Sequence, residues 1–201
     1  PIPEQQKIVA IEQWGNSEWE TMEGSFFGCE NLEYNATDVP DLSRVTDLSD
    51  MFFNAKRFNG AIGNWDVSTI TTLESMFAGA ESFDQPLEDW DVSKVENMSF
   101  LFFGADAFDQ NISTWDVREV TTMESMFLGG KFNKSLANWS TGNVTNMNAM
   151  FANNDAFNQP IASWDVSKVT SMVGMFRDTE VFNAPLDDWD VSSVTDMREM
   201  F

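Results

Sequence analysis

The sequence predicts an α/β solenoid in which each coil consists of a short helix and a short parallel strand. Three observations support this prediction. Tryptophan recurs at a nearly constant interval, apolar residues follow it at helical spacing, and the rest of each interval contains proline and no helical period. One such unit cannot bury its own apolar residues, so consecutive units are expected to stack into one continuous core.

The repeat is defined by tryptophans that are 25, 25, 24, 25 and 25 residues apart. They are Trp65, Trp90, Trp115, Trp139, Trp164 and Trp189. A row of phenylalanines recurs in the same rhythm and comprises Phe58, Phe83, Phe108, Phe132, Phe157 and Phe182. These two rows are predicted to form the structural core, with like side chains packed on one another from coil to coil. The short unit lacks one residue near Gly129 and Gly130.

Each repeat divides into two halves with different predicted structures. Residues 169–179 carry valine, methionine and phenylalanine at helical spacing, which predicts a short helix with one buried face. Ser167, supported by Asp165, is expected to cap the start of that helix. Pro160 excludes a helix in the other half, so residues 161–164 are predicted to be extended and to pair in parallel. Because repeats of about 20–29 residues are typical of leucine-rich repeats, we expect a right-handed, leucine-rich-repeat-like solenoid.

The repeat weakens toward the N-terminus, which sets the domain organisation. Residues 40–201 are tandem repeats of about 25 residues that stop in mid-repeat at Phe201. Residues 1–39 are interpreted as an N-terminal cap followed by a degenerate first repeat, since terminal repeats are atypical. Cys29 occupies a slot that alanine fills in other repeats, which indicates a small buried residue. We expect the natural protein to continue beyond Phe201, with flanking domains in the same chain.

The composition limits the partners. The formal net charge is −22, which argues against nucleic acid and against anionic membrane surfaces. No run of about 18 apolar residues is present, so no membrane span is predicted. With a single cysteine, the chain forms no internal disulfide and no cysteine-based metal site. Cations, basic proteins and neutral glycans remain as partners.

Carboxylates are the main candidates for chemistry. A row of aspartates follows the tryptophans and comprises Asp66, Asp91, Asp116, Asp165 and Asp190. A glycosidase needs two carboxylates in different environments, whereas a repeated row gives its members the same environment. The chain has no histidine, so nucleophilic catalysis assisted by histidine is excluded. The prediction is therefore a protein that is not an enzyme, with no catalytic residues and no cofactor.

Calcium binding by this aspartate row is the alternative to a capping role. Rows of carboxylates can supply several oxygen ligands to calcium, but no EF-hand loop or other calcium repeat is present. Capping by the aspartate and serine of each repeat is the preferred interpretation.

Two further rows carry polar residues around the phenylalanine. The row directly after it is expected to hydrogen-bond to backbone groups as a ladder, with a surface-exposed binding row as the alternative. Its members are Asn59, Asp84, Asp109, Asn133, Asn158 and Asn183. The residues before the phenylalanine are expected to face solvent and to hold any specificity; they include Lys56, Arg57, Glu81, Ser82, Asp106, Ala107, Asn154 and Asp155.

The motif WDVSKVTSMVGMF at residues 164–176 resembles the repeat of the BspA-like leucine-rich-repeat surface proteins. The same repeat is known from Mycoplasma surface lipoproteins, and the N-terminal residues 11–46 are similar to marine Bacteroidetes members. The resemblance implies an exported, cell-surface or extracellular protein. In Bacteroidetes it also implies type IX secretion by a C-terminal sorting domain, and some members resemble adhesins. The family has no shared catalytic residues.

Together these observations predict a non-enzymatic cell-surface or extracellular repeat module for adhesion or protein–protein interaction. Its partner is expected to be a protein or a glycan on another cell or in a matrix. The alternatives are a carbohydrate-binding appendage and a structural spacer of a larger secreted protein.

Overall fold

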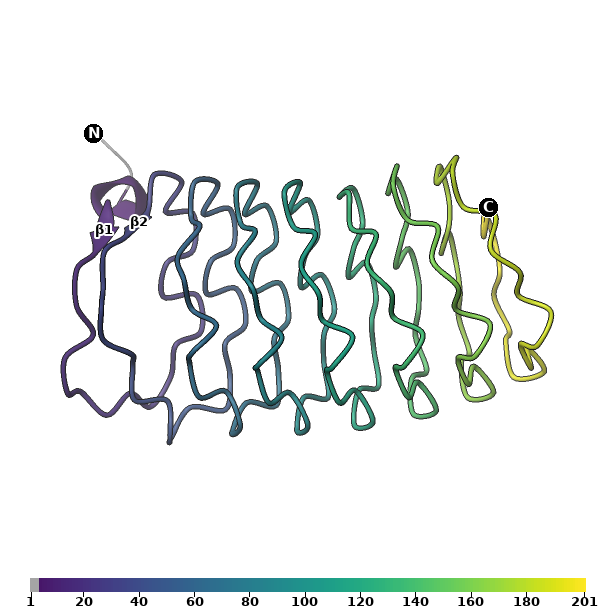
Figure 1. Ribbon diagram of the computed structural model, residues 1–201, viewed down its shortest axis with the longest axis horizontal. Coiled ribbons are helices and arrows are strands. Elements are labelled where there is room, and N and C mark those ends of the chain that lie inside the picture. The colour runs from purple at the N-terminus through teal and green to yellow at the C-terminus, as the bar shows by residue number, and fades with distance from the viewer. Residues whose placement is uncertain (1–3) are drawn as a thin grey trace.

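The computed structural model describes residues 4–201, which form a stack of coils along one long axis (Figure 1). In this described part, helices and strands occur only near the N-terminus: η1 (Glu4–Lys7), β1 (Ala10–Ile11) and β2 (Glu33–Tyr34). β1 pairs in parallel with β2, with Ala10 opposite Glu33 and Ile11 opposite Tyr34. No helix within residues 4–201 has the length and apolar character needed to cross a membrane.

The predicted α/β solenoid of helix-plus-strand coils is wrong. Residues 169–179 form turns, and Gly174 and Asp178 have φ of 61° and 56°, in the left-handed region that ends a right-handed helix. Residues 161–164 form no strand. Single parallel bridges occur instead in the half that was predicted to be helical. They join Asp47, Thr72, Asn97, Thr122, Asn146, Ser171 and Asp196 in succession.

Tight turns with left-handed residues replace the predicted helix. We count positions from the tryptophan, so that Trp65 is position 1 and Thr72 is position 8. Position 11 has positive φ in each coil and is occupied by Gly24, Asp50, Ser75, Phe100, Ser125, Ala149, Gly174 and Glu199. Position 15 does so as well and is occupied by Gly28, Asn54, Gly79, Gly104, Gly129, Asn153 and Asp178. A type II β-turn requires a positive φ at the third of its four residues.

The peptide groups of positions 8–15 join each coil to the next. Asp50 N donates to Glu74 O at 2.9 Å and Phe52 N donates to Met76 O at 2.9 Å, and the pattern repeats along the stack. The N–H groups at positions 9, 11, 13 and 15 donate in this way, whereas those at positions 12, 14 and 16 close turns within their own coil. The result is four columns of hydrogen-bonded peptide groups that run along the stack, which we call the peptide columns.

Stacked aromatic rows fill the core beside the peptide columns. Trp90 and Trp115 have ring centroids 6.5 Å apart and an interplanar angle of 5°. Phe77 stacks on Phe52 of the preceding coil, with ring centroids 5.8 Å apart, and on Phe83 of its own coil, with ring centroids 4.1 Å apart. Each such ring removes roughly 150–250 Å² from water, so the stack is held largely by aromatic burial.

Side-chain hydrogen bonds join the coils on the side away from the peptide columns. The Nε1–H of Trp115 donates to Leu87 O of the preceding coil at 2.9 Å. Asn133 Oδ1 accepts from Asn158 N and from Gln159 Nε2, both at 3.0 Å. The row that follows the phenylalanine therefore forms the predicted backbone ladder.

Candidate functional site

The aspartates of the proposed calcium row cap turns. Asp66 Oδ1 accepts from Ser68 N at 3.1 Å and from Ser68 Oγ at 2.6 Å, and Asp165 binds Ser167 in the same way. The side-chain hydrogen bond from Ser68 lowers the pKa of Asp66 below its usual value. Because no helix follows, the predicted helix cap is corrected to a side-chain-closed turn.

This row gives no enclosed group of metal ligands. In residues 4–201, no three or more histidine, cysteine, aspartate or glutamate side chains lie close enough to hold a metal ion. The members Asp66, Asp91, Asp165 and Asp190 are exposed, and Asp116 is half-buried beside Arg118, with Nη2 to Oδ2 at 2.6 Å.

The predicted core residues lie inside the stack. The rows from Trp65 to Trp164 and from Phe58 to Phe157 are buried, whereas Trp189 and Phe182 near the C-terminal end are half-buried. Cys29 is buried as well, and its burial raises the pKa of the thiol. These residues form the packing of the stack.

The residues before the phenylalanine lie on the surface, with one exception. Lys56 Nζ lies 3.8 Å from Glu30 Oε1 and 3.9 Å from Glu81 Oε1, so it links three coils by weak surface ion pairs. The prediction that Asn154 faces solvent is wrong, because it is fully buried. Its Nδ2 donates to Phe132 O at 3.3 Å, beside the coil that is one residue short.

Sequence reasoning missed a set of surface side chains, most of them aromatic, on the side of the peptide columns. We call it the aromatic edge and define it as Phe27 and Phe103, which are exposed, and Phe53, Phe100 and Leu128, which are half-buried. Phe27 is 43% exposed and Phe103 is 38% exposed. Phe27 and Phe53 stack with ring centroids 4.7 Å apart, and Phe100 meets Phe103 edge-on at 6.2 Å. Three phenylalanine pairs in the sequence, at 26–27, 52–53 and 102–103, were the available signal.

Carboxylates flank the aromatic edge. Burial and the nearby charges of Glu74, Glu23 and Asp47 raise the pKa of Asp50, which lies one turn before Phe53. Negative charge beside exposed aromatic rings suits a partner that carries both basic and apolar groups.

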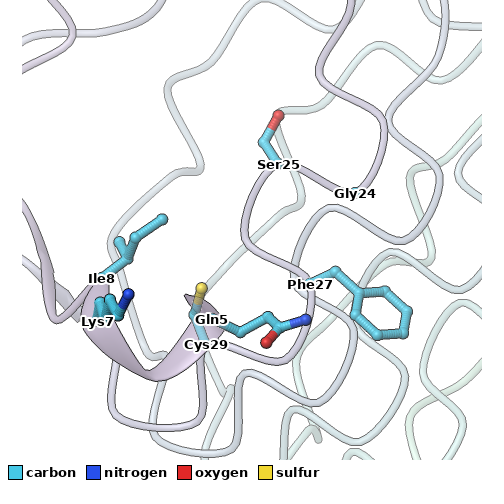
Figure 2. Close-up of a pocket in the computed structure, with 7 residues that line it drawn as sticks. All are labelled: Gln5, Lys7, Ile8, Gly24, Ser25, Phe27 and Cys29. Atoms are coloured by element: carbon cyan, nitrogen blue, oxygen red, sulfur yellow. The ribbon is translucent and has the colours of Figure 1, made fainter. Parts of the chain in front are cut away.

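Two cavities lie at the N-terminal end of the stack. The first measures about 430 Å³ (Figure 2) and is lined by Gln5, Lys7, Ile8, Gly24, Ser25, Phe27 and Cys29. The second measures about 380 Å³ and is lined by Ala10, Ile11, Glu12, Gln13, Trp14, Trp19 and Phe26. Both cavities lie where the N-terminal segment meets the first coil, residues 14–39.

Comparison with known proteins identifies a family. Searches of curated proteins and of solved structures returned no match. The model of the family described as "Mycoplasma protein of unknown function, DUF285" matches residues 20–136 and again residues 129–201. The two matches overlap within the short coil, at residues 129–136, and together cover most of the chain. The chain therefore belongs to the DUF285 family of Mycoplasma proteins of unknown function.

Proposed function

We propose that this chain is a non-enzymatic module that binds a protein partner along the aromatic edge, at a cell surface or outside the cell. The observation that carries the proposal is the exposure of Phe27 and Phe103, while the phenylalanine rows at positions 13 and 19 are buried in the inner coils. Exposed aromatic rings on a protein surface are typical of protein interaction sites. The resemblance to BspA-like surface proteins, including the marine Bacteroidetes members, supports the location and the adhesive role.

The aromatic edge predicts the character of the partner. Aromatic rings supply most of the affinity at protein interfaces, and charged groups around them set specificity and the rate of association. The carboxylates near Asp50 therefore favour a partner with lysine or arginine beside an apolar patch. Increasing salt is expected to weaken such binding.

The test measures binding of the immobilised chain to a panel of purified extracellular-matrix proteins by biolayer interferometry. The double variant Phe53→Ala/Phe103→Ala is expected to lose binding, because it removes surface rings of the aromatic edge from two coils. The matched control is Val181→Ala/Val191→Ala, which removes side chains that are 43% and 40% exposed away from this edge. Equal binding by both variants contradicts the proposal. Absence of binding by the unsubstituted chain to every protein of the panel also contradicts it and favours a structural spacer.

Glycan binding is the second candidate, and the second cavity favours it. Trp14, Trp19 and Phe26 supply aromatic surface there, and Glu12 and Gln13 supply polar groups that can bond to sugar hydroxyls. A glycan array at low and high salt separates the candidates, because binding to a neutral sugar is insensitive to salt. The variant Glu12→Ala is expected to weaken such binding, and Glu18→Ala, an exposed glutamate outside the cavity lining, is its control.

A further inference from the structure

The first coil turns a row of unpaired backbone carbonyls toward the N-terminal end of the stack. The N–H groups of Gly24, Phe26 and Gly28 donate to the second coil, with N–O distances of 2.9, 2.9 and 2.7 Å. In a trans peptide the carbonyl points away from the following N–H, and no cis peptide is found in the described residues. The carbonyls of Glu23, Ser25 and Phe27 therefore point away from the second coil. Among residues 4–201 they accept no hydrogen bond.

The peptide columns give this row a negative potential. In an ordinary strand, successive peptide groups point in opposite directions and their dipoles cancel. Here the N–H groups of positions 9, 11, 13 and 15 all point toward the next coil. The N–H groups of positions 12, 14 and 16 instead form hydrogen bonds within turns of their own coil. The dipoles of the four peptide columns add along the stack as in a helix, where the end that exposes carbonyls is negative. In this stack that end is the N-terminal one. The N–H groups at positions 7 and 18 donate to the preceding coil and oppose this dipole in part, but four columns outnumber two.

In the described part of the N-terminal segment, residues 4–13, no backbone hydrogen bond is made to the carbonyl row. β1 meets the first coil beyond the row, where Glu33 N donates to Val9 O and Asn35 N to Ile11 O, both at 2.9 Å. η1 lies against Gly28, since a Cβ added there would be 3.6 Å from Gln5. Between these contacts and residues 23–27 lies the first cavity (Figure 2), with Gly24, Ser25 and Phe27 in its wall.

We propose that this row is a docking edge for an extended segment of a basic partner polypeptide. Its main-chain N–H groups would donate to the carbonyls of Glu23, Ser25 and Phe27, as each inner coil donates to its successor. An apolar side chain would cover Phe27 and Ile8, which are 43% and 42% exposed.

Charge selects the partner for this edge. Residues 5–39 contain seven carboxylates and one lysine, so a segment rich in lysine or arginine is attracted. A second copy of the chain is disfavoured, because each copy carries a net charge of −22. This site is separate from the aromatic edge except at Phe27, and it does not depend on the function proposed above.

The probe is a fluorescein-labelled synthetic peptide with the sequence of residues 42–58, which fills positions 3–19 of a coil and carries three basic and two acidic residues. The charge control is the peptide of residues 67–83, which fills the same positions with two glutamates and no basic residue. The donor control is the first peptide with N-methyl groups on the amides of Asp50, Phe52 and Asn54. Binding to the 201-residue chain is followed by fluorescence anisotropy.

We expect the basic peptide to bind with one site per chain, the acidic peptide to bind more weakly, and N-methylation to weaken binding by about tenfold or more. Phe27→Ala is expected to weaken binding, whereas Phe103→Ala, at the same coil position and 38% exposed, leaves it unchanged. Both rings are exposed, so neither substitution removes core packing.

Four results would overturn the proposal. Three of them are absence of peptide binding, equal binding of the N-methylated peptide, and self-association of the chain that the basic peptide does not disrupt. If Phe103→Ala weakens peptide binding as much as Phe27→Ala, the peptide occupies the aromatic edge and this docking edge is rejected. The matrix-protein experiment with Phe53→Ala/Phe103→Ala has an independent outcome, so failure of one proposal is distinguishable from failure of the other.

Discussion

The two sides of each coil are joined to the next coil by different kinds of hydrogen bond. On the side of positions 8–15, main-chain N–H groups meet main-chain carbonyls, as from Phe102 N to Met126 O at 3.0 Å. Outside these positions, main-chain bonds between coils recur only at positions 7 and 18, and side chains are partners in the other bonds that recur from coil to coil. Trp139 Nε1 donates to Ile112 O at 3.1 Å, and Asn133 Oδ1 accepts from Asn158 N.

This difference explains where the sequence varies between coils. Main-chain bonding leaves the side chain free, and position 10 accordingly holds glutamate, serine, asparagine, valine or arginine. Side-chain bonding fixes the residue, so tryptophan and asparagine or aspartate recur on the other side. A partner-binding surface can therefore change on the main-chain side without loss of the fold, and the aromatic edge lies there.

The largest expected effect separates a core ring from an exposed ring. Phe83 is fully buried, and its ring centroid lies 4.1 Å from that of Phe77 and 6.0 Å from that of Phe108. Phe83→Ala is expected to lower the free energy of unfolding by about 3–5 kcal/mol, through lost burial and the cavity left behind. Phe103→Ala, on the main-chain side, is expected to change it by less than about 0.5 kcal/mol. Urea denaturation measures both, and similar losses would contradict the division between the two sides.

A glycine pair tests the main-chain side itself. Gly79 and Gly104 both occupy position 15, with φ of 68° and 60°. A Cβ at Gly104 meets nothing within 4 Å, whereas a Cβ at Gly79 overlaps Asn54 Oδ1. Gly104→Ala is expected to cost about 1 kcal/mol from its left-handed backbone, and Gly79→Ala about 2 kcal/mol. Thermal unfolding compares them. The additional loss of stability at Gly79 should disappear in the double variant Gly79→Ala/Asn54→Gly. If that additional loss persists, the overlap with Asn54 is not its cause.

The side-chain ladder is tested at Asn133. Asn133→Ala removes the acceptor for Asn158 N and Gln159 Nε2, each at 3.0 Å, and is expected to cost about 1 kcal/mol. Asn133→Asp keeps the Oδ1 acceptor, as Asp84 and Asp109 do in the same row, and should retain most of the stability. Hydrogen exchange of the Asn158 amide reports the bond directly. Unchanged protection in Asn133→Ala would show that this bond does not hold the coil.

The smallest effect concerns charge on the two sides. The pKa of Asp50 is raised by burial and by Glu74, so its ionisation opposes folding above the ordinary aspartate pKa of about 3.9. Asp50→Asn is expected to stabilise the chain at pH 7 by less than about 0.5 kcal/mol, and this gain should vanish below about pH 4.

Ionisation of Asp66 has the opposite effect on stability, because hydrogen bonds from Ser68 lower its pKa. Its contribution to stability is present above the ordinary aspartate pKa and is lost as the pH falls through the lowered pKa. Asp66→Asn should therefore destabilise the chain slightly at neutral pH. Melting temperatures across a pH series measure both variants, and shifts of the same sign would contradict this assignment.

The period and the stacked rows could be predicted from the sequence, because the tryptophan interval and the ladder asparagines repeat residue by residue. The helix over 169–179 could not, because turns that close from position 12 to 9 and from 16 to 13 bury the same side chains as a helix. Glycine, asparagine or aspartate at position 15 was a usable signal against a helix. Phe100 and Ala149 carry positive φ without any such signal.

The candidate surfaces were less accessible to sequence reasoning. No prediction was drawn from the phenylalanine pairs at 26–27, 52–53 and 102–103, in which the second ring lies outside the buried row. The carbonyl row of the first coil is made of main-chain atoms, so no residue type marks it. The direction in which these carbonyls point is known only from the hydrogen bonds between the coils.

The buried amide of Asn154 bears on how much the length of one coil can vary. It donates to Phe132 O beside the coil that is one residue short. The ring spacing from Trp115 to Trp139 is 6.5 Å, as it is from Trp90 to Trp115. The stack thus holds one unit of unequal length while its tryptophan row keeps an even spacing, so the periodicity of the core is less demanding than the periodicity of the chain.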